Sequence, residues 1–175
     1  LLGGSQGAEA LNRIMPDALA LVRERLPGRT VSLTHQAGER NIETARERYA
    51  GANDVNVLAY LDDMAEAYAQ TDLAVCRAGA MTVSELAAVG VASVLIPYPY
   101  AVDDHQTANG RYLADADAAV LIPESEFDAE RLADEMARLI SAPRRLAEMG
   151  RRARELGFPD ATEKVAAVCE EVAHA

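Results

Sequence analysis

Short runs of β-branched and aliphatic residues alternate along the chain with longer segments in which apolar residues recur at helical spacing. This pattern predicts strands at 30–34, 55–59, 73–76, 94–96 and 119–122. It predicts helices at 8–26, 39–49, 62–69, 81–89, 105–113, 128–140, 143–155 and 160–173. Strands separated by helices of this length form parallel βαβ units. We therefore predict a single α/β domain over residues 1–175, a doubly wound parallel sheet with helices on both faces.

The first residues carry only part of a strand pattern. Leu1 and Leu2 lead directly into a glycine-rich turn, whereas a core strand usually has about five residues. We therefore expect that the first strand is truncated and that the chain is a piece of a longer protein.

Composition removes several classes of function. The 175 residues include 17 Lys and Arg against 28 Asp and Glu, a net charge of −11, which argues against binding to nucleic acid. No apolar run reaches the ~18 residues of a membrane span. Cys76 and Cys169 lie in apolar surroundings, so we expect two buried thiols in a reducing, intracellular compartment rather than a disulfide framework.

The residues with distinctive chemistry fall after predicted strands. Ligands of doubly wound sheets bind outside the carboxyl ends of the strands. Those ends carry the segments 3–7, 35–36, 60–61, 77–81 and 97–106. One edge of the sheet is therefore the predicted site.

The glycine-rich turn at 3–7 follows a strand and opens a helix, an arrangement that suits an anion such as phosphate. The alternative is a tight turn that binds nothing. The third glycine of a dinucleotide fingerprint is missing, and the next strand ends in His35 and Gln36 instead of an acid that holds ribose. The pattern therefore does not favour NAD.

The same turn also matches the G-x-S-x-G nucleophile elbow of α/β-hydrolases. In that interpretation Ser5 is the nucleophile and His105 or His174 is the base. Several strands precede such an elbow in the hydrolases, and an oxyanion-loop sequence is missing here. The hydrolase is the weaker hypothesis.

A second junction of strand, glycine and helix occupies residues 77–85. Its helix start points to the same edge, Thr82 lies in the first turn, and the carboxylate of Glu85 can accept two hydrogen bonds from a ribose diol. Two helix starts at one edge can hold a diphosphate without a metal. The alternative is a capping box formed by Thr82 and Glu85.

Polar residues dominate segment 103–109. Gln106 and Asn109 lie one helical turn apart and form a usable pair for sugar hydroxyls. The alternative is a helix start capped by Asp103 or Asp104. Neighbouring helical side chains diverge, so Asp104 and His105 make a poor metal site. The Asp-Ala-Asp sequence at 115–117 lies at the other edge and predicts a solvated turn. We therefore predict no metal and no cofactor.

Together these segments resemble the MurG family of peptidoglycan glycosyltransferases. The resemblance covers the whole chain and is carried by 3–8 (GGSQGA), 60–64 (YLDDM), 77–85 (RAGAMTVSE), 97–109 (PYPYAVDDHQTAN) and 159–162 (PDAT). It implies the Rossmann-like, donor-binding C-terminal half of a two-domain, B-type glycosyltransferase.

The resemblance also implies site residues. Leu61 would contact uracil through its backbone, Glu85 the ribose and Gln106 the sugar, while Ser5, Met81 and Thr82 would cradle the diphosphate. The implied UDP-sugar-binding residues are Ser5, Leu61, Ala80, Met81, Thr82, Val83, Ser84, Glu85 and Gln106, with Gly4, Gln6, Tyr60, Arg77, His105 and Asn109 in secondary positions. Some family members have a glutamine in place of His105.

The activity implied is the inverting transfer of N-acetylglucosamine from UDP-GlcNAc to lipid I, which makes lipid II on the cytoplasmic face of the bacterial plasma membrane. The acceptor, the membrane surface and the catalytic base would belong to the absent half, so we expect this chain to bind donor without turnover. Another UDP-sugar transferase, an epimerase half and a non-catalytic nucleotide-binding module remain open alternatives.

The last predicted helix has an apolar face formed by Val165, Val168, Cys169 and Val172. In the family this helix crosses to the other domain. We therefore expect part of this face to be exposed or paired between copies, the alternative being ordinary packing on the chain's own helices.

Overall fold

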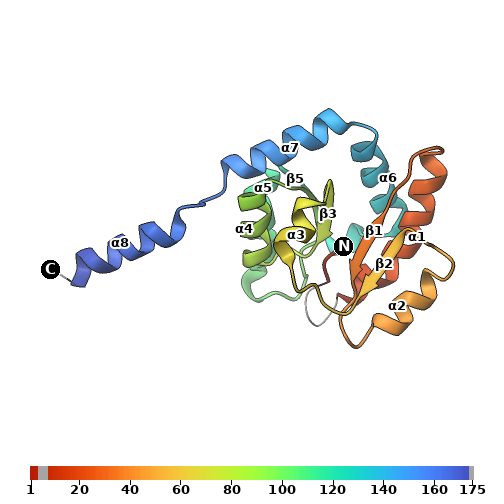
Figure 1. The fold of residues 1–175 in the computed structure, drawn as a ribbon, viewed down its shortest axis with the longest axis horizontal. Coiled ribbons are helices and arrows are strands. Elements are labelled where there is room, and N and C mark those ends of the chain that lie inside the picture. Colours follow the sequence, from red (N-terminus) through yellow and green to blue (C-terminus); the bar gives the residue numbers. More distant parts are fainter. Residues whose placement is uncertain (4–7, 174–175) are drawn as a thin grey trace.

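A parallel sheet forms the centre of the molecule in the computed structural model, which describes residues 1–3 and 8–173 (Figure 1). Within that range its strands are β1 (Leu33–Gln36), β2 (Val55–Leu58), β3 (Leu73–Cys76), β4 (Ala92–Leu95) and β5 (Ala119–Leu121). β1 pairs with β2, and β4 lies between β3 and β5. Leu2 forms parallel bridges to Gln36 and to Cys76, and thereby connects the two groups. The order across the sheet is therefore β2, β1, Leu2, β3, β4 and β5.

Helices cover both faces of this sheet. They are α1 (Glu9–Arg25), α2 (Ile42–Arg48), α3 (Met64–Ala69), α4 (Ala80–Val89), α5 (His105–Ala114), α6 (Ala129–Ile140), α7 (Pro143–Glu155) and α8 (Ala161–Ala173), with short 3₁₀ turns η1 (Val102–Asp104) and η2 (Glu124–Glu126). α1 packs on α6, while α4 packs on α3, α5 and α7. The predicted doubly wound fold is confirmed.

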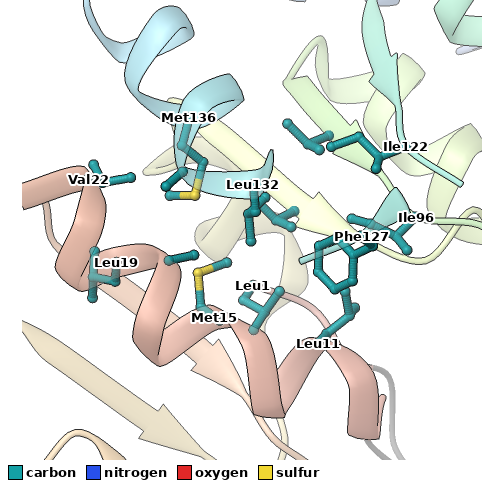
Figure 2. Close-up of a cluster of buried hydrophobic side chains, with 14 of the residues drawn as sticks. Leu1, Leu11, Met15, Leu19, Val22, Ile96, Ile122, Phe127, Leu132 and Met136 are labelled. Atoms are coloured by element: carbon teal, nitrogen blue, oxygen red, sulfur yellow. The ribbon is translucent and has the colours of Figure 1, made fainter. Parts of the chain in front are cut away.

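One core lies between the sheet and the pair formed by α1 and α6. Leu11, Met15, Leu19 and Val22 repeat along α1 at helical spacing and are almost fully buried, as the pattern predicts. Figure 2 shows them facing Leu132 and Met136 of α6, among other buried side chains. Each such side chain contributes about 1.5–3 kcal/mol by leaving water. This packing holds the start of α1 at the carboxyl edge of the sheet.

The opposite face of the sheet carries a second core. Cys76 and Leu95 pack there with Leu86 of α4 and Leu113 of α5. Every residue of β4 is buried, which confirms that both faces of this strand are covered. α4 and α5 are thereby fixed with their first turns at the carboxyl edge.

The strand predicted at 30–34 is wrong in position, because β1 runs from Leu33 to Gln36. The ring of His35 is completely buried, with Nδ1 3.0 Å from the Tyr49 hydroxyl and Nε2 2.9 Å from Asn12 Oδ1. These partners satisfy a polar side chain inside a strand, which the alternation of apolar residues could not indicate. Burial, together with the smaller effect of the nearby N-terminal amine, lowers the pKa of His35 to about 3.

A cavity of about 540 Å³ lies at the amino edge of the sheet, between the beginnings of β1 and β3. This amino-edge cavity has a mixed lining, in which apolar side chains such as Leu19, Leu33 and Met136 are joined by polar ones that include Arg29 and Asp72. The amine of Leu1 donates a hydrogen bond to the carbonyl of Thr34 at 2.7 Å. Burial lowers the pKa of this amine to about 6.

α8 extends away from the rest of the molecule (Figure 1) and buries none of its side chains. Val165, Val168 and Val172 are exposed, which confirms the expectation of an exposed apolar face. The prediction of two buried thiols is half wrong, because Cys76 is buried but Cys169 on α8 is exposed. The apolar residues around Cys169 do recur at helical spacing, but no described residue packs against α8 closely enough to bury any of its side chains. No helix in the described part of the chain is long and apolar enough to span a bilayer.

Candidate functional site

The carboxyl edge of the sheet contains a pocket of about 520 Å³. Residues from the start of α1, the exits of β3 and β4, α5 and η2 form its wall. The residues of this carboxyl-edge pocket are Gly3, Ala8, Glu9, Ala10, Arg13, Arg77, Tyr98, Gln106 and Glu124. The structure thus brings together the two ends of the glycine turn, Arg77 and Gln106, as predicted for one site. Gly4, Ser5, Gln6 and His174 lie outside the described residues.

Arg77 leaves the end of β3 and reaches across the exit of β4. Its Nη1 donates to the carbonyls of Ile96 and Pro97, both at 3.2 Å. Its Nη2 lies 2.5 Å from Oε2 of Glu124, and its guanidinium stacks 5.4 Å from the ring centroid of Tyr98. Arg77 therefore connects the exits of three neighbouring strands.

Gln106 lies in the first turn of α5 and has a defined orientation. Its Oε1 accepts a hydrogen bond from the backbone N–H of Tyr98 at 3.0 Å. The other end of the amide, which carries the N–H donors, is therefore turned away from Tyr98. Asn109 donates through Nδ2 to the carbonyl of Ala78 at 3.2 Å, which ties α5 to the turn before α4. The two amides thus differ in function: Gln106 lines the pocket, whereas Asn109 holds two elements together.

The residues before α5 have unusual backbone angles. Asp103 and Asp104 have φ of 50° and 51°, in the left-handed region that non-glycine residues seldom occupy. Oδ1 of Asp104 accepts a hydrogen bond from the Thr107 hydroxyl at 2.6 Å, and Asp104 makes no side-chain cap to a backbone N–H. Of the predicted alternative, a helix start capped by Asp103 or Asp104, the position is confirmed for Asp104, which is the N-cap residue, but its carboxylate forms no bond to a backbone N–H. His105 is the first residue of α5, and its side chain is exposed.

α4 begins with Gly79 as its N-cap, and its first intrahelical bond joins the Val83 N–H to the Gly79 carbonyl at 2.9 Å. A helix leaves its first N–H groups without an acceptor of its own. In α4 those groups belong to Ala80, Met81 and Thr82. The Met81 side chain is 77% exposed at this end. Ser84 is also exposed, whereas Val83 packs in the core.

The alternative of a capping box is wrong. Because Gly79 is the N-cap, Thr82 falls inside the first turn instead of before it. The carboxylate of Glu85 accepts a hydrogen bond at Oε2 from the hydroxyl of Tyr68, at 3.0 Å. Burial, and then the neighbouring Cys76 and Glu85, raise the pKa of Tyr68. Glu85 is therefore held from α3, in a half-buried position that leaves it available to a ligand.

The segment between β2 and α3 follows the same edge. The Tyr60 side chain is 56% exposed, and Leu61 is half-buried. Asp63 accepts a hydrogen bond from the Glu66 N–H at 2.8 Å and caps α3. Tyr60 and Leu61 do not line the carboxyl-edge pocket, so the structure places them along the edge and not in the same hollow.

The sequence did not identify Tyr68, Tyr98 or Glu124 as site residues. The partners of Tyr68 and Glu124 are distant in the chain, so no local motif marks these two residues. Tyr98 lies inside the segment 97–109, but its contacts with Arg77 and Gln106 depend on the fold. Asp117, in contrast, lies at the amino edge and pairs with Arg152 at 2.7 Å. Its place in a solvated turn is confirmed.

Comparisons with known proteins show the family to which the chain belongs. The Glycosyltransferase family 28 C-terminal domain matches residues 1–165. The chain is 49% identical, over 100% of its length and 48% of the relative, to a Burkholderia vietnamiensis protein named UDP-N-acetylglucosamine--N-acetylmuramyl-(pentapeptide) pyrophosphoryl-undecaprenol N-acetylglucosamine transferase. A Paraburkholderia xenovorans protein of the same name is 48% identical, over 99% of this chain and 46% of its own length.

Solved structures give the same result. The crystal structure of Acinetobacter baumannii MurG matches with a TM-score of 0.87 and 40% identity, over 97% of this chain and 48% of that one. The glycosyltransferase VinC, solved with dTDP, shares the fold at a TM-score of 0.65 and 15% identity, over 94% of this chain and 40% of that one. The chain spans about half the length of the relatives that it matches. It belongs to glycosyltransferase family 28, as a C-terminal domain of that family.

Proposed function

We propose that this chain is the donor-binding half of a glycosyltransferase that moves N-acetylglucosamine from UDP-GlcNAc to lipid I in peptidoglycan synthesis. The observation that carries the proposal is the wall of the carboxyl-edge pocket. There, Gln106 turns its amide donors away from Tyr98, beside the two ends of the glycine turn. Family membership and the names of the relatives support the same function.

Each part of the donor has suitable groups at this edge. The half-buried carboxylate of Glu85 can accept hydrogen bonds from the ribose hydroxyls. The first N–H groups of α4, at Ala80, Met81 and Thr82, suit the diphosphate, since a helix start favours negative charge. The backbone of Leu61, with Tyr60 beside it, suits the edge of uracil, and Gln106 suits the sugar hydroxyls.

Stabilisation of the departing UDP is the chemical contribution we assign to this half. The hydrogen-bond donors at this edge are already oriented before the bond between UDP and the sugar breaks. They therefore lower the barrier of the transfer, because they need no reorganisation during the reaction. We assign three further features to the rest of a full-length protein. These are the base that takes the proton of the acceptor hydroxyl, the lipid I site, and the contact with the inner face of the plasma membrane. We therefore expect this chain to bind UDP-GlcNAc and to make no lipid II by itself.

Isothermal titration of the chain with UDP, UDP-GlcNAc and UDP-GalNAc tests the proposal. We expect UDP and UDP-GlcNAc to bind, with a preference for UDP-GlcNAc over UDP-GalNAc. Glu85→Ala should weaken both ligands by about tenfold or more, because about 1.4 kcal/mol of lost hydrogen bonding corresponds to tenfold in Kd. Glu135→Ala, which removes a carboxylate from α6 on the other face, serves as the control. A folded chain that binds none of the three ligands contradicts the proposal, and a preference for UDP-GalNAc indicates a different UDP-sugar enzyme.

A further inference from the structure

Arg77 and Glu124 form an ion pair whose position requires three strands to end side by side. Arg77 follows β3, and Glu124 belongs to η2, which follows β5. The side chains are only 17% and 26% exposed, so each charge is largely removed from water and depends on the other. The pair crosses the exit of β4, which lies between them in the sheet.

The loop that leaves β4 is held against this pair. The guanidinium of Arg77 binds the carbonyls of Ile96 and Pro97 and stacks on the ring of Tyr98. A planar guanidinium can serve such bonds in fixed directions, because its five N–H donors lie in one plane. The position of the Tyr98 backbone is therefore set from Arg77.

Tyr98 in turn sets the side chain of Gln106. Its backbone N–H donates to Oε1 of Gln106, and this bond decides which end of the amide accepts and which end donates. Gln106, Tyr98, Arg77 and Glu124 all line the same pocket. A continuous series of contacts thus runs from Glu124 to the amide of Gln106.

We propose that Arg77 and Glu124 are positioning residues that orient Gln106 and thereby set how strongly the site prefers a UDP-sugar over UDP. This inference rests on the proposed function, because it assigns Gln106 to the sugar. It gives a role to Arg77, for which the family resemblance implies only a secondary position, because Arg77 acts here through the loop after β4.

The test is isothermal titration of UDP and UDP-GlcNAc with Glu124→Gln, which keeps the shape of the side chain but removes its charge. We expect the Kd for UDP-GlcNAc to rise by about tenfold while the Kd for UDP changes by less than about twofold. Arg77→Lys should give the same pattern, because lysine keeps the charge and lacks the planar fork. The matched control is Glu130→Gln, which breaks an ion pair with Arg25 on another part of the surface.

A double substitution shows whether the effect passes through Gln106. In a Gln106→Ala background, Glu124→Gln should have no further effect on the ratio of the two Kd values. An equal loss of UDP and UDP-GlcNAc in Glu124→Gln, or an unchanged ratio, overturns the inference while leaving UDP binding by the unchanged chain intact. Failure of the unchanged chain to bind UDP overturns the proposed function itself. Retained UDP binding by each variant shows that the variant is folded.

Discussion

The two edges of the sheet carry hollows of nearly equal size, about 520 Å³ at the carboxyl edge and about 540 Å³ at the amino edge. Their walls are different. In the carboxyl-edge pocket Arg77, Glu124, Tyr98 and Gln106 hold one another in fixed orientations. The amino-edge cavity has an apolar majority with polar side chains such as Arg29 and Asp72 among its lining residues, and no interlocked set of polar side chains among the residues that the structure describes there. Volume therefore does not distinguish a binding site from a gap in packing, whereas oriented polar groups do.

Because the walls differ, we expect the two edges to affect different properties, the stability of the fold at the amino edge and the affinity for the donor at the carboxyl edge. A gap lined mainly by apolar groups forfeits contacts and costs stability. A wall of oriented donors and acceptors matches the ligand site proposed for the carboxyl edge. Changes at the amino edge should therefore alter the free energy of unfolding, and changes at the carboxyl edge should alter the Kd of the donor.

The largest effect should come from pH, through two buried basic groups. The Leu1 amine lies beside the amino-edge cavity, and the His35 ring lies in the core between Asn12 and Tyr49. The pKa of the Leu1 amine is lowered to about 6 from 8.0, and that of His35 to about 3 from 6.5. The unfolded chain therefore binds protons that the folded chain does not, and acid favours unfolding. We expect the free energy of unfolding to fall by about 4 kcal/mol from pH 8 to pH 5, measured by urea titration.

An acetylated chain and one substitution separate the contribution of the Leu1 amine to this pH dependence from that of His35. Acetylation of the amine should remove the part of the slope between about pH 8 and pH 6. His35→Gln, which keeps a polar side chain near Asn12 and Tyr49, should remove the part below about pH 6.5. A flat profile, or identical slopes in all three proteins, contradicts the assignment of these two groups.

An apolar strand that fills the amino-edge cavity should have the next largest effect. Three valines added before Leu1 can continue as an extended segment between β1 and β3, since Leu2 already bridges both neighbouring strands. Burial of about 1.5–3 kcal/mol per side chain, less the cost of ordering the segment, predicts a net gain of about 3 kcal/mol in the free energy of unfolding.

The control for this extension is Gly-Ser-Gly at the same place. It also moves the amine out of its buried position, but it brings little apolar surface. We expect the valine extension to be the more stable of the two, with the Kd for UDP unchanged within about twofold. Equal stability of the two extensions would show that the cavity does not accept a strand.

The sequence was sufficient for the features that depend on neighbouring residues. The apolar repeat on α1, the buried strand β4 and the Asp63 cap of α3 each follow from residues a few positions apart. The position of β1 did not, because the buried polar pair His35 and Gln36 conceals the strand pattern.

The candidate site was predictable only in part, for a related reason. Gln106 and Glu85 lie in helices whose starts could be identified, so their place at one edge followed from the fold class. The partners that orient them come from other βα units: Tyr68 for Glu85, and the pair of Arg77 and Glu124 for Gln106. Such partners are set by strand order, which local patterns do not encode.

The smallest effect concerns the bond between Tyr68 and Glu85 at the carboxyl edge. Tyr68→Phe removes only the hydroxyl that donates to the Glu85 carboxylate at 3.0 Å. The carboxylate then has more rotational freedom, and ordering it on binding costs roughly 1 kcal/mol. We expect the Kd for UDP and for UDP-GlcNAc to rise by the same factor, about fivefold, in isothermal titration.

The equal factor distinguishes this bond from the one at Gln106. Glu85 is assigned to the ribose, which both ligands carry, whereas Gln106 is assigned to the sugar, which only UDP-GlcNAc carries. Tyr112→Phe is the matched control, because its hydroxyl donates to the Leu156 carbonyl at 2.7 Å, outside the carboxyl-edge pocket. If Tyr68→Phe leaves both Kd values unchanged, the hydroxyl does not orient Glu85. If Tyr112→Phe weakens both as much, binding follows general stability, and the proposed separation between the two edges fails.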